Sequence, residues 1–318
     1  MNVLILSAAA KVLLVRAFAD AAHARGGRVF AADVAADSAA LFAADQAVLL
    51  PPSDAPEFAT TLVDYCRRHA ISLVVPTRDG ELDVLAAARA ALAGIGATAL
   101  VASPDALAIC QDKRRFVAFC AANGLATPRT YEPGEVPSRF PVFVRPVRGA
   151  GGDGARRVAK AADLPTDDEL LVQALETAPE YSVDVLMDLS GRPLQAVARR
   201  RLLVRDGEAV KSRVEAVPVL EVQALRLCAA LGLVGHNVVQ AFWSPEIEPR
   251  FIEINPRFGG ASNLSIQAGL DSPARLLAML AGEAGAVTPR AITQGLTLLR
   301  YAEDRLVTDA ELASVAGP

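Results

Sequence analysis

The first hundred residues alternate between short apolar runs and longer stretches of helical character, and this alternation restricts the possible folds more than any other feature. The apolar runs are rich in Val, Leu and Ala, which is typical of strands buried on both faces. Alternating strands and helices predict a parallel sheet wrapped by helices. The predicted strands cover residues 3–6, 29–32, 48–50, 73–75 and 98–101, and the predicted helices cover about 11–24, 58–69 and 82–93.

The pattern changes after Ser103-Pro104. A Pro- and Gly-rich connection follows one further helix and leads into a series of strands. This order predicts an α+β fold with antiparallel sheets, so we expect an N-terminal α/β domain over residues 1–104 and a second domain over 105–318. The predicted strands of the second domain cover 140–145, 155–160, 170–173, 180–187, 195–201, 237–243 and 250–255, and its helices cover about 112–123 and 222–231.

Composition and charge argue against several classes of function. The 318 residues carry a net charge of −4 and no basic run, so nucleic acid is not an expected partner. The four cysteines are scattered without metal-ligand spacing, which is typical of reduced thiols in a cytosolic protein. The apolar start of the chain lacks a basic region and indicates a buried strand rather than a signal peptide. Arg89, Gly94 and Gly96 interrupt the Ala-rich stretch at about residues 85–101, so we expect no membrane span and a cytoplasmic location.

A glycine-rich loop stands between two predicted strands in the second domain. Gly149, Gly151, Gly152 and Gly154 fit G-x-G-x-x-G, but no strand–helix pair surrounds them as a dinucleotide site requires. A glycine loop between strands suits a flap whose N–H groups close over phosphates, and an ordinary hairpin is the alternative. Arg145 ends the strand that feeds the loop, where its two-pronged donor can bind a phosphate. The alternative for Arg145 is a surface charge at a strand end.

The strand at 250–255 carries a second candidate site. Glu253 and Asn255 are two residues apart, so they project from one face of an otherwise apolar strand. Two oxygen ligands on a rigid strand suit Mg²⁺, which is usually held by few protein oxygens together with substrate phosphates. Gln240 on the preceding strand can face the same position, and Arg257 follows on the turn. The alternative for Glu253 alone is an edge-strand carboxylate, but unpaired polar groups inside an apolar strand are costly.

Residues 171–184 provide a third element. A strand ends near Gln173, and a new strand begins at Glu180 after a short hinge. Such a hinge can hold an adenine ring against backbone groups, and Glu180 can accept hydrogen bonds from ribose hydroxyls. Taken by itself, the segment is equally consistent with a plain hairpin.

Together these residues resemble the ATP-grasp superfamily, and within it the ATP-binding lobes of carbamoyl phosphate synthetase large subunits and small stand-alone relatives. The resemblance covers nearly the whole chain. Asp112-Lys113, the glycine loop, residues 173–184, Gln240 and Glu253–Arg257 fall in the family's order and spacing. The N-terminal part looks like the domain that precedes the grasp in this family. This joint pattern is more specific than any of its pieces.

The resemblance implies a role for each matching residue. It implies ATP and Mg²⁺ as cofactors, with Mn²⁺ as an alternative metal. Gln173 stands where a carboxylate is common in the family, and its amide oxygen can still accept from an adenine amino group. The implied roles are phosphate binding by Lys113 and Arg145, a mobile flap from Gly149, Gly151, Gly152 and Gly154, adenine binding by Gln173 and Leu175, ribose binding by Glu180, metal binding by Gln240, Glu253 and Asn255, and stabilisation of the transferring phosphoryl group or acyl phosphate by Arg257.

Lys211 and Arg213 form a further candidate pair. Alternation places both on one face of a predicted strand, with Ser212 opposite. Two cations near the flap and Arg257 would suit an anionic acceptor or the phosphoryl group in transfer. The alternative is a solvated basic edge strand that prevents sheets from associating.

The expected activity is therefore an ATP-dependent ligation through an acyl phosphate, with release of ADP and phosphate. The partners are a small-molecule carboxylate and a nucleophile, an amine or alternatively a thiol. The identity of both stays open, as does the oligomeric state, with a homodimer as one option. The alternative of a different class is a non-catalytic ATP-binding regulatory or partner subunit.

Overall fold

The N-terminal part of the chain folds into a five-stranded parallel sheet, as the strand–helix alternation predicts. The computed structural model describes residues 1–9, 11–149, 152–315 and 317–318. The strand order is β3-β2-β1-β4-β5. The strands are β1 (Asn2–Ile5), β2 (Val29–Asp33), β3 (Gln46–Leu49), β4 (Ile71–Val75) and β5 (Thr98–Ala99), and they are joined by α1 (Val12–His23), α2 (Phe58–Arg68), α3 (Leu82–Ala93) and the 3₁₀ turns η1 (Ala39–Ala43) and η2 (Asp79–Glu81).

The order of this sheet reverses at β1. From β1 the chain proceeds outward to β2 and β3, then returns to β4 on the other side. The loops that follow β1 and β4 therefore diverge at one edge of the sheet, which is where open α/β sheets usually bind ligands. The loop after β4, which contains η2, contacts the second half of the chain through Asp79.

Two short helices connect the two halves of the molecule. α4 (Pro104–Cys110) begins with Ser103 as its N-cap, since the Ser103 hydroxyl accepts from the N–H of Ala106. α5 (Lys113–Ala122) is capped in the same way by the carboxylate of Asp112. The architecture changes where α4 begins. The exact domain boundary at residue 104 stays a prediction, because apolar packing continues across it.

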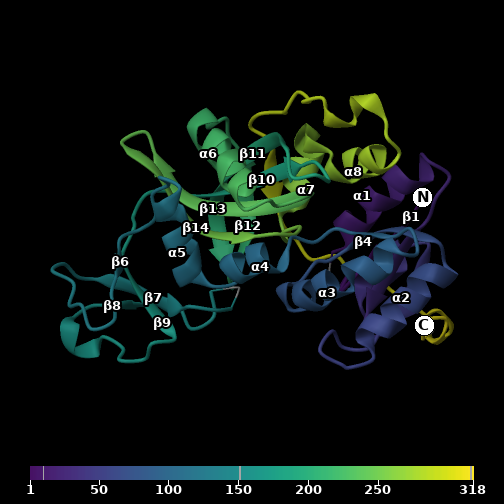
Figure 1. Ribbon diagram of the computed structural model, residues 1–318, viewed down its shortest axis with the longest axis horizontal. Helices are drawn as coiled ribbons and strands as arrows, with labels where there is room; N and C mark the ends of the chain where they lie inside the picture. Colours follow the sequence, from purple (N-terminus) through teal and green to yellow (C-terminus); the bar gives the residue numbers. More distant parts are fainter. Residues whose placement is uncertain (10, 150–151, 316) are drawn as a thin grey trace.

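A small four-stranded sheet in the order β6-β9-β7-β8 follows α5 and forms its own lobe (Figure 1). Its pairings are antiparallel, as expected. β7 begins two residues later than predicted because Pro141 has no N–H for the ladder. The strands are β6 (Thr130–Tyr131), β7 (Val142–Pro146), β8 (Arg156–Val158) and β9 (Leu170–Ala174), with the 3₁₀ turn η3 (Ala161–Asp163) before β9.

A larger six-stranded antiparallel sheet, in the order β14-β13-β10-β11-β12-β15, forms the centre of the second half. The long helix α6 (Pro218–Ala230) covers one face, and it begins four residues earlier than predicted because proline fits the first turn of a helix. The strands are β10 (Glu180–Met187), β11 (Pro193–Arg205), β12 (Glu208–Val214), β13 (His236–Ser244), β14 (Ile247–Asn255) and β15 (Thr297–Leu299).

Among the remaining elements, helix α8 packs against α1 of the N-terminal domain (Figure 1). In the described residues, no helix is both long and apolar enough to cross a membrane. These elements are α7 (Ser262–Ser265), the π turn η4 (Ile266–Leu270), α8 (Ser272–Leu280), the 3₁₀ turn η5 (Ala284–Val287) and α9 (Asp309–Ala313).

The apolar core is continuous between the two halves. One cluster runs from one face of the parallel sheet, at Leu4 and Val74, to the six-stranded sheet at Val183 and to its covering helix α6 at Leu220. A second cluster joins the other face of the parallel sheet to α8. The predicted fold class is therefore confirmed: a parallel-sheet domain followed by an α+β domain with antiparallel sheets.

Candidate active site

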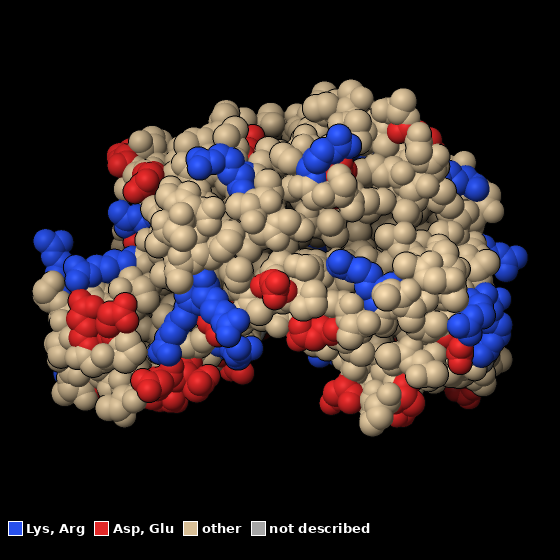
Figure 2. Space-filling model, in the orientation of Figure 1, with Lys and Arg blue, Asp and Glu red and all other residues tan. Residues whose placement is uncertain are grey.

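A cavity of about 900 Å³ lies where the two antiparallel sheets face each other and the N-terminal domain closes one end. Its walls come from the four-stranded sheet, the face of the six-stranded sheet opposite α6, and the loop after β4. In Figure 2 the outline of the molecule is indented between the small lobe and the N-terminal domain, and basic and acidic side chains lie on both sides of the indentation. The lining contains ten Lys or Arg residues against seven Asp or Glu residues, although the whole chain is net negative. The cavity thus favours an anionic ligand.

The register of the six-stranded sheet places four polar side chains in one row across the cavity wall. Glu253 on β14 pairs with Gln240 on β13, Gln240 pairs with Ser182 on β10, and Ser182 pairs with Arg199 on β11. Asn255 lies two residues along β14 and also lines the cavity. The predicted metal-binding residues Gln240, Glu253 and Asn255 are therefore brought together by cross-strand pairing.

Each of these three residues has a guanidinium group close to its side-chain oxygen. Arg201 Nη1 donates to Gln240 Oε1 at 2.8 Å, and Arg257 Nη2 donates to Asn255 Oδ1 at 3.1 Å. Arg145 Nη1 lies 3.6 Å from Glu253 Oε2. Among the described residues, no group of three or more His, Cys, Asp or Glu side chains is positioned to hold a metal. A cation here would be held by few protein oxygens.

The four-stranded sheet turns Arg145 and Gln173 toward the same cavity. Arg145 is 5% exposed, and its Nη2 donates to the carbonyl of Ile252 at 2.9 Å, which ties the two sheets together. Burial lowers the pKa of Arg145, while the neighbouring Glu253 raises it. Gln173 donates to Thr130 Oγ1 at 2.9 Å. Both residues lie where phosphate and base of a nucleotide could reach them from the cavity.

Lys113 and described residues of the glycine loop line the cavity close to each other. Lys113 Nζ donates to the carbonyl of Gly149 at 2.8 Å, and burial lowers the pKa of Lys113. Gly149 and Gly152 line the cavity with positive φ angles of 107° and 75°, a conformation that favours glycine. Gly154 does not line it and packs against Pro146 instead. Gly151 lies outside the described residues.

Leu175 and Glu180 line the cavity on the hinge between the two sheets, and their roles at the base and ribose stay a prediction. Glu180 Oε1 accepts from Arg201 Nη1 at 2.7 Å. Burial raises the pKa of Glu180, and the positive charge of Arg201 acts against this shift. Glu180 therefore faces the cavity as the partner of an arginine rather than as an isolated carboxylate.

Arg257 makes a contact that the sequence did not indicate. Its Nε and Nη2 bind the two carboxylate oxygens of Asp79 at 2.7 and 2.6 Å. Asp79 belongs to η2, in the loop that follows β4 of the N-terminal domain. The N-terminal domain thus supplies a carboxylate to the site, and no local pattern could reveal it because the two residues are 178 positions apart.

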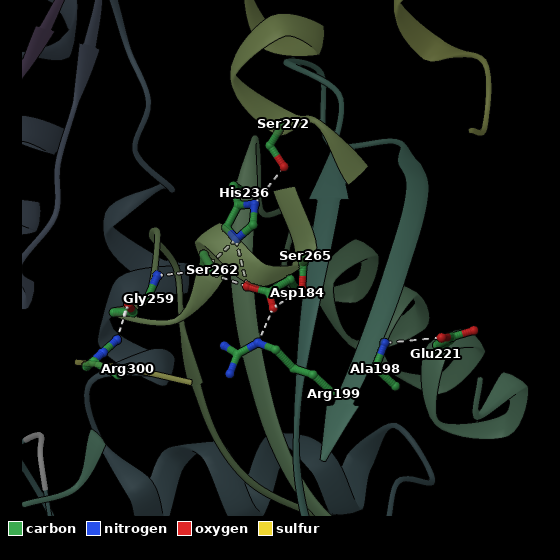
Figure 3. Close-up of polar contacts among 11 residues, drawn as sticks. Asp184, Ala198, Arg199, Glu221, His236, Gly259, Ser262, Ser265, Ser272 and Arg300 are labelled. Atoms are coloured by element: carbon green, nitrogen blue, oxygen red, sulfur yellow. Dashed lines mark hydrogen bonds and ion pairs between the residues drawn. The ribbon is translucent and has the colours of Figure 1, made fainter. Parts of the chain in front are cut away.

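A buried polar network beside the cavity was also missed (Figure 3). Asp184 is fully buried and accepts from Arg199 Nε at 2.5 Å, from Ser262 Oγ and Ser265 Oγ at 2.6 Å each, and from His236 Nε2 at 2.9 Å. Burial alone would raise the pKa of Asp184, but Arg199 and the hydrogen bond from His236 hold it well below its usual range. Alternation on β10 could have indicated Asp184, since an Asp inside an apolar strand needs partners.

The prediction that Lys211 and Arg213 lie beside the cavity is wrong. The two residues do share an exposed face of β12, with Ser212 buried between them. Ser212 pairs with Arg201, a cavity residue, so Lys211 and Arg213 point to the opposite face of the sheet and do not line the cavity. The alternative of an edge strand is also wrong, because β15 pairs with β12 on its outer side.

Two antiparallel sheets that enclose a cavity rich in Lys and Arg, preceded by a parallel-sheet domain, have the architecture that the resemblance to the ATP-grasp superfamily implies. Family models identify the two parts more closely. The N-terminal domain of PylC-like proteins matches residues 3–100, and the family described as ATP-grasp in the biosynthetic pathway with Ter operon matches residues 166–303. Within these two ranges the chain carries a PylC-like N-terminal domain and an ATP-grasp domain, and the resemblance to the ATP-grasp superfamily is confirmed.

Solved structures agree with this fold. Biotin carboxylase from Campylobacter jejuni matches with a TM-score of 0.72 and 16% identity, over 92% of this chain and 73% of that one. L-amino acid ligase from Bacillus licheniformis matches with a TM-score of 0.66 and 18% identity, over 91% and 77%. A pyruvate carboxylase variant from Rhizobium etli matches with a TM-score of 0.66 and 18% identity over 87% of this chain, which spans only 28% of that protein.

Proposed function

We propose that this chain uses ATP to phosphorylate a carboxylate and passes the acyl group to a nucleophile, an amine or a thiol. The observation that carries the proposal is the row of Gln240 and Glu253, with Asn255 beside it, in a cavity that both sheets line with cations. Such a site binds a polyphosphate through positioned charges, and phosphoryl transfer depends mainly on positioning and charge neutralisation.

The residues present fit a magnesium ion. Their donors are carboxylate and amide oxygens, which hard cations prefer, and few protein oxygens suit a metal that keeps water and phosphate ligands. Gln240, Glu253 and Asn255 would hold the ion, and Mn²⁺ would accept the same donors. The bound metal would supply neutralisation of phosphate charge. Arg145, Arg201 and Arg257, which contact these oxygens in the structure, would bind the phosphates instead when the metal is present.

The other predicted residues act as binding groups. Lys113 and Arg145 would bind phosphates beneath the glycine loop, and Gln173 with Leu175 would bind the adenine edge. Glu180 would accept from ribose. Each of these side chains lines the cavity, which supports this division of roles.

The chemical steps balance without a further reactant. A carboxylate oxygen attacks the γ-phosphorus of ATP, the bond to the bridging oxygen breaks, and ADP leaves with that electron pair. Arg257 would stabilise the charge on the phosphoryl oxygens during this step. The nucleophile then attacks the acyl carbon and phosphate leaves. An amine gives up one proton as the amide forms.

Structural neighbours support the nucleotide. The biotin carboxylase from Campylobacter jejuni is described as a beta-gamma-ATP complex, and the 2-oxoglutarate carboxylase domain of Hydrogenobacter thermophilus as a complex with MgADP and bicarbonate. L-amino acid ligase from Bacillus licheniformis is a further neighbour, and it is a ligase for amino acids, which supports a ligation reaction. The matching family model, with its reference to a biosynthetic pathway, favours a biosynthetic ligase for this chain.

A release assay with a trapping nucleophile tests the proposal. The protein is incubated with MgATP, hydroxylamine and a panel of carboxylic acids, and ADP and hydroxamate are measured. We expect one or more acids to give both products in equal amounts. AMP and pyrophosphate would indicate adenylation and contradict the acyl phosphate. ATP binding by calorimetry without ADP release for any acid would favour the non-catalytic subunit, and NAD binding in place of ATP would exclude both.

A further inference from the structure

Arg199 is a buried arginine that uses only its Nε as a hydrogen-bond donor within the described residues. It is 2% exposed, yet it lines the cavity. Its Nε donates to Asp184 Oδ2 at 2.5 Å. Within the described part of the chain, neither terminal nitrogen of Arg199 has a hydrogen-bond partner, and neither is fully buried. In Figure 3 these two nitrogens point away from the bond to Asp184. The guanidinium is thus fixed at one end and open at the other.

The anchor of Arg199 is held more firmly than a surface ion pair would be. Asp184 also accepts from two serine hydroxyls and from His236, so both carboxylate oxygens are saturated. His236 is buried, stacks on Phe258 at 4.2 Å, and contacts Ser272 through Nδ1. Because Asp184 can only accept, Nε2 carries the imidazole proton. The whole network leaves Arg199 little freedom to move.

The same network fixes a second part of the cavity wall. Ser262 Oγ donates to Asp184 Oδ1 and accepts from the N–H of Gly259 at 2.9 Å (Figure 3). Gly259 and Gly260 follow Arg257 and line the cavity. One buried carboxylate therefore positions both the free guanidinium of Arg199 and the glycine turn beside it.

Stability alone does not account for this arrangement. Buried ion pairs contribute little net stability, since desolvation offsets much of the attraction. A pair that served only packing would also bond its remaining donors, because buried unpaired polar groups are costly. Arg199 instead keeps two parallel N–H groups open, in the planar geometry that matches a carboxylate or phosphate.

The position of Arg199 in the cavity restricts which ligand it can bind. It stands in the same cross-strand row as Glu253 and Gln240, separated from Glu253 by two intervening strands, roughly 14 Å at the backbone. Arg145 Nη1 lies 3.6 Å from Glu253 at the opposite end of this row, and Arg145 and Lys113 are the expected partners of the nucleotide phosphates. An anion at Arg199 would lie at the end of the row away from these expected phosphate ligands, where the acid substrate can be held.

We infer that Arg199 binds the carboxylate of the acid substrate through its two terminal nitrogens, with Asp184 and His236 as positioning residues. This inference rests on the proposed function and assigns its acceptor site. The acceptor is an organic acid that presents a planar, ionised carboxylate to the fork. The corresponding primary amide lacks the negative charge, and its NH₂ group would face the N–H groups of Arg199, so the amide is not bound.

A binding experiment tests the inference without turnover. Acetate, lactate, glycine, succinate and glutamate, each beside its primary amide, are titrated into the protein saturated with MgADP, and affinity is measured from thermal shifts. We expect at least one carboxylate, and none of the amides, to stabilise the parent. In Arg199→Lys, which keeps the charge but loses the fork, the affinity for that carboxylate falls by ~10- to 100-fold, while the affinity for MgADP stays unchanged.

Arg200→Met is the matched control. Arg200 is the next residue on β11, points to the other face of the sheet and does not line the cavity. It should bind the carboxylate as the parent does. A carboxylate that binds equally well to Arg199→Lys, or a parent that responds to none of the five acids, overturns the inference. If Arg199→Lys loses MgADP affinity in parallel, Arg199 has a structural role instead.

Failure of the proposed function gives a different result. If the parent binds MgADP and a carboxylate through Arg199 but forms no hydroxamate with ATP and hydroxylamine, the acceptor site stands and the acyl-phosphate mechanism is wrong. If the parent is active and Arg199→Lys has the same KM for the acid, the ligase function stands and the assignment of Arg199 to the acceptor site is wrong.

Discussion

The two faces of the six-stranded sheet are built from alternate residues of the same strands, but they serve different ends. On β10, Tyr181, Val183 and Val185 belong to the apolar cluster that packs against α6, whereas Ser182 lines the cavity and Asp184 anchors the polar network. A shift of one residue in register would exchange the two sets completely. A substitution should therefore act on stability or on activity according to which face of the sheet its side chain occupies.

The largest effect is expected on the cavity face at Glu253. Glu253→Gln preserves the shape of the side chain and removes the charge that faces the proposed metal position. ADP release with the acid found by the screen should fall by ~1,000-fold, the upper range for losing a positioned group in a transition state. The melting temperature should stay close to that of the parent. Steady-state kinetics and a thermal melt measure the two quantities, and near-normal ADP release would remove Glu253 from the site.

The packed face provides the opposite case at Leu220. Leu220 is fully buried on α6 against the sheet. Leu220→Ala should lower the free energy of unfolding by about 3 kcal/mol, because it removes buried methyl groups and leaves a cavity. The KM values at a temperature where the variant is folded should match those of the parent. Denaturant unfolding measures the loss, and a changed KM for ATP with unchanged stability would contradict the division between the faces.

The outcome of the sequence predictions follows the same division. Most buried strands were predicted because they read as apolar runs, and β10 has the predicted bounds at Glu180 and Met187, whereas the short strands β6 and β15 were missed. Gln240, Glu253 and Asn255 could be brought together because period-2 alternation and hairpin pairing are local. α4 was missed, although Ser103 as N-cap with Pro104 after it is a helix-start signal.

Other parts of the site depend on register and domain packing, which the sequence does not encode locally. Lys211 and Arg213 were correctly placed on one face of a strand, but the choice of face needed the pairing of Ser212 with Arg201. The contact between Asp79 and Arg257 needed the docking of the N-terminal domain. Such contacts arise from tertiary packing, so neither periodicity nor a motif reports them.

An intermediate effect is expected from the pH dependence of Asp184. Its pKa is held below the usual range in the folded state, so its contribution to stability is fully present above the ordinary pKa of an Asp and is lost as pH falls through the folded value. The melting temperature of the parent should therefore decline toward acid pH more steeply than that of Asp184→Asn, which has no carboxylate to protonate. Thermal melts between about pH 7 and about pH 3 measure this difference, and parallel curves for the two proteins would exclude Asp184 as the titrating group.

The smallest effect is expected at Arg213, on the face of β12 away from the cavity. Arg213 is exposed and pairs with Arg200 and Thr297 on the neighbouring strands, and neither it nor Lys211 lines the cavity. Arg213→Ala should change ADP release by less than about twofold and stability by less than about 0.5 kcal/mol, as is usual for surface positions.

Arg201→Ala supplies the contrast for Arg213. Arg201 pairs with Ser212 and binds both Gln240 and Glu180 in the cavity. Its loss should weaken MgATP binding by about tenfold, since hydrogen bonds to a charged donor are removed at two predicted ligand-binding residues. Steady-state ADP release at saturating acid compares the two variants. A hundredfold loss in Arg213→Ala, with Arg201→Ala unchanged, would mean that the opposite face of β12 reaches the reacting groups and that parity along this strand does not separate activity from stability.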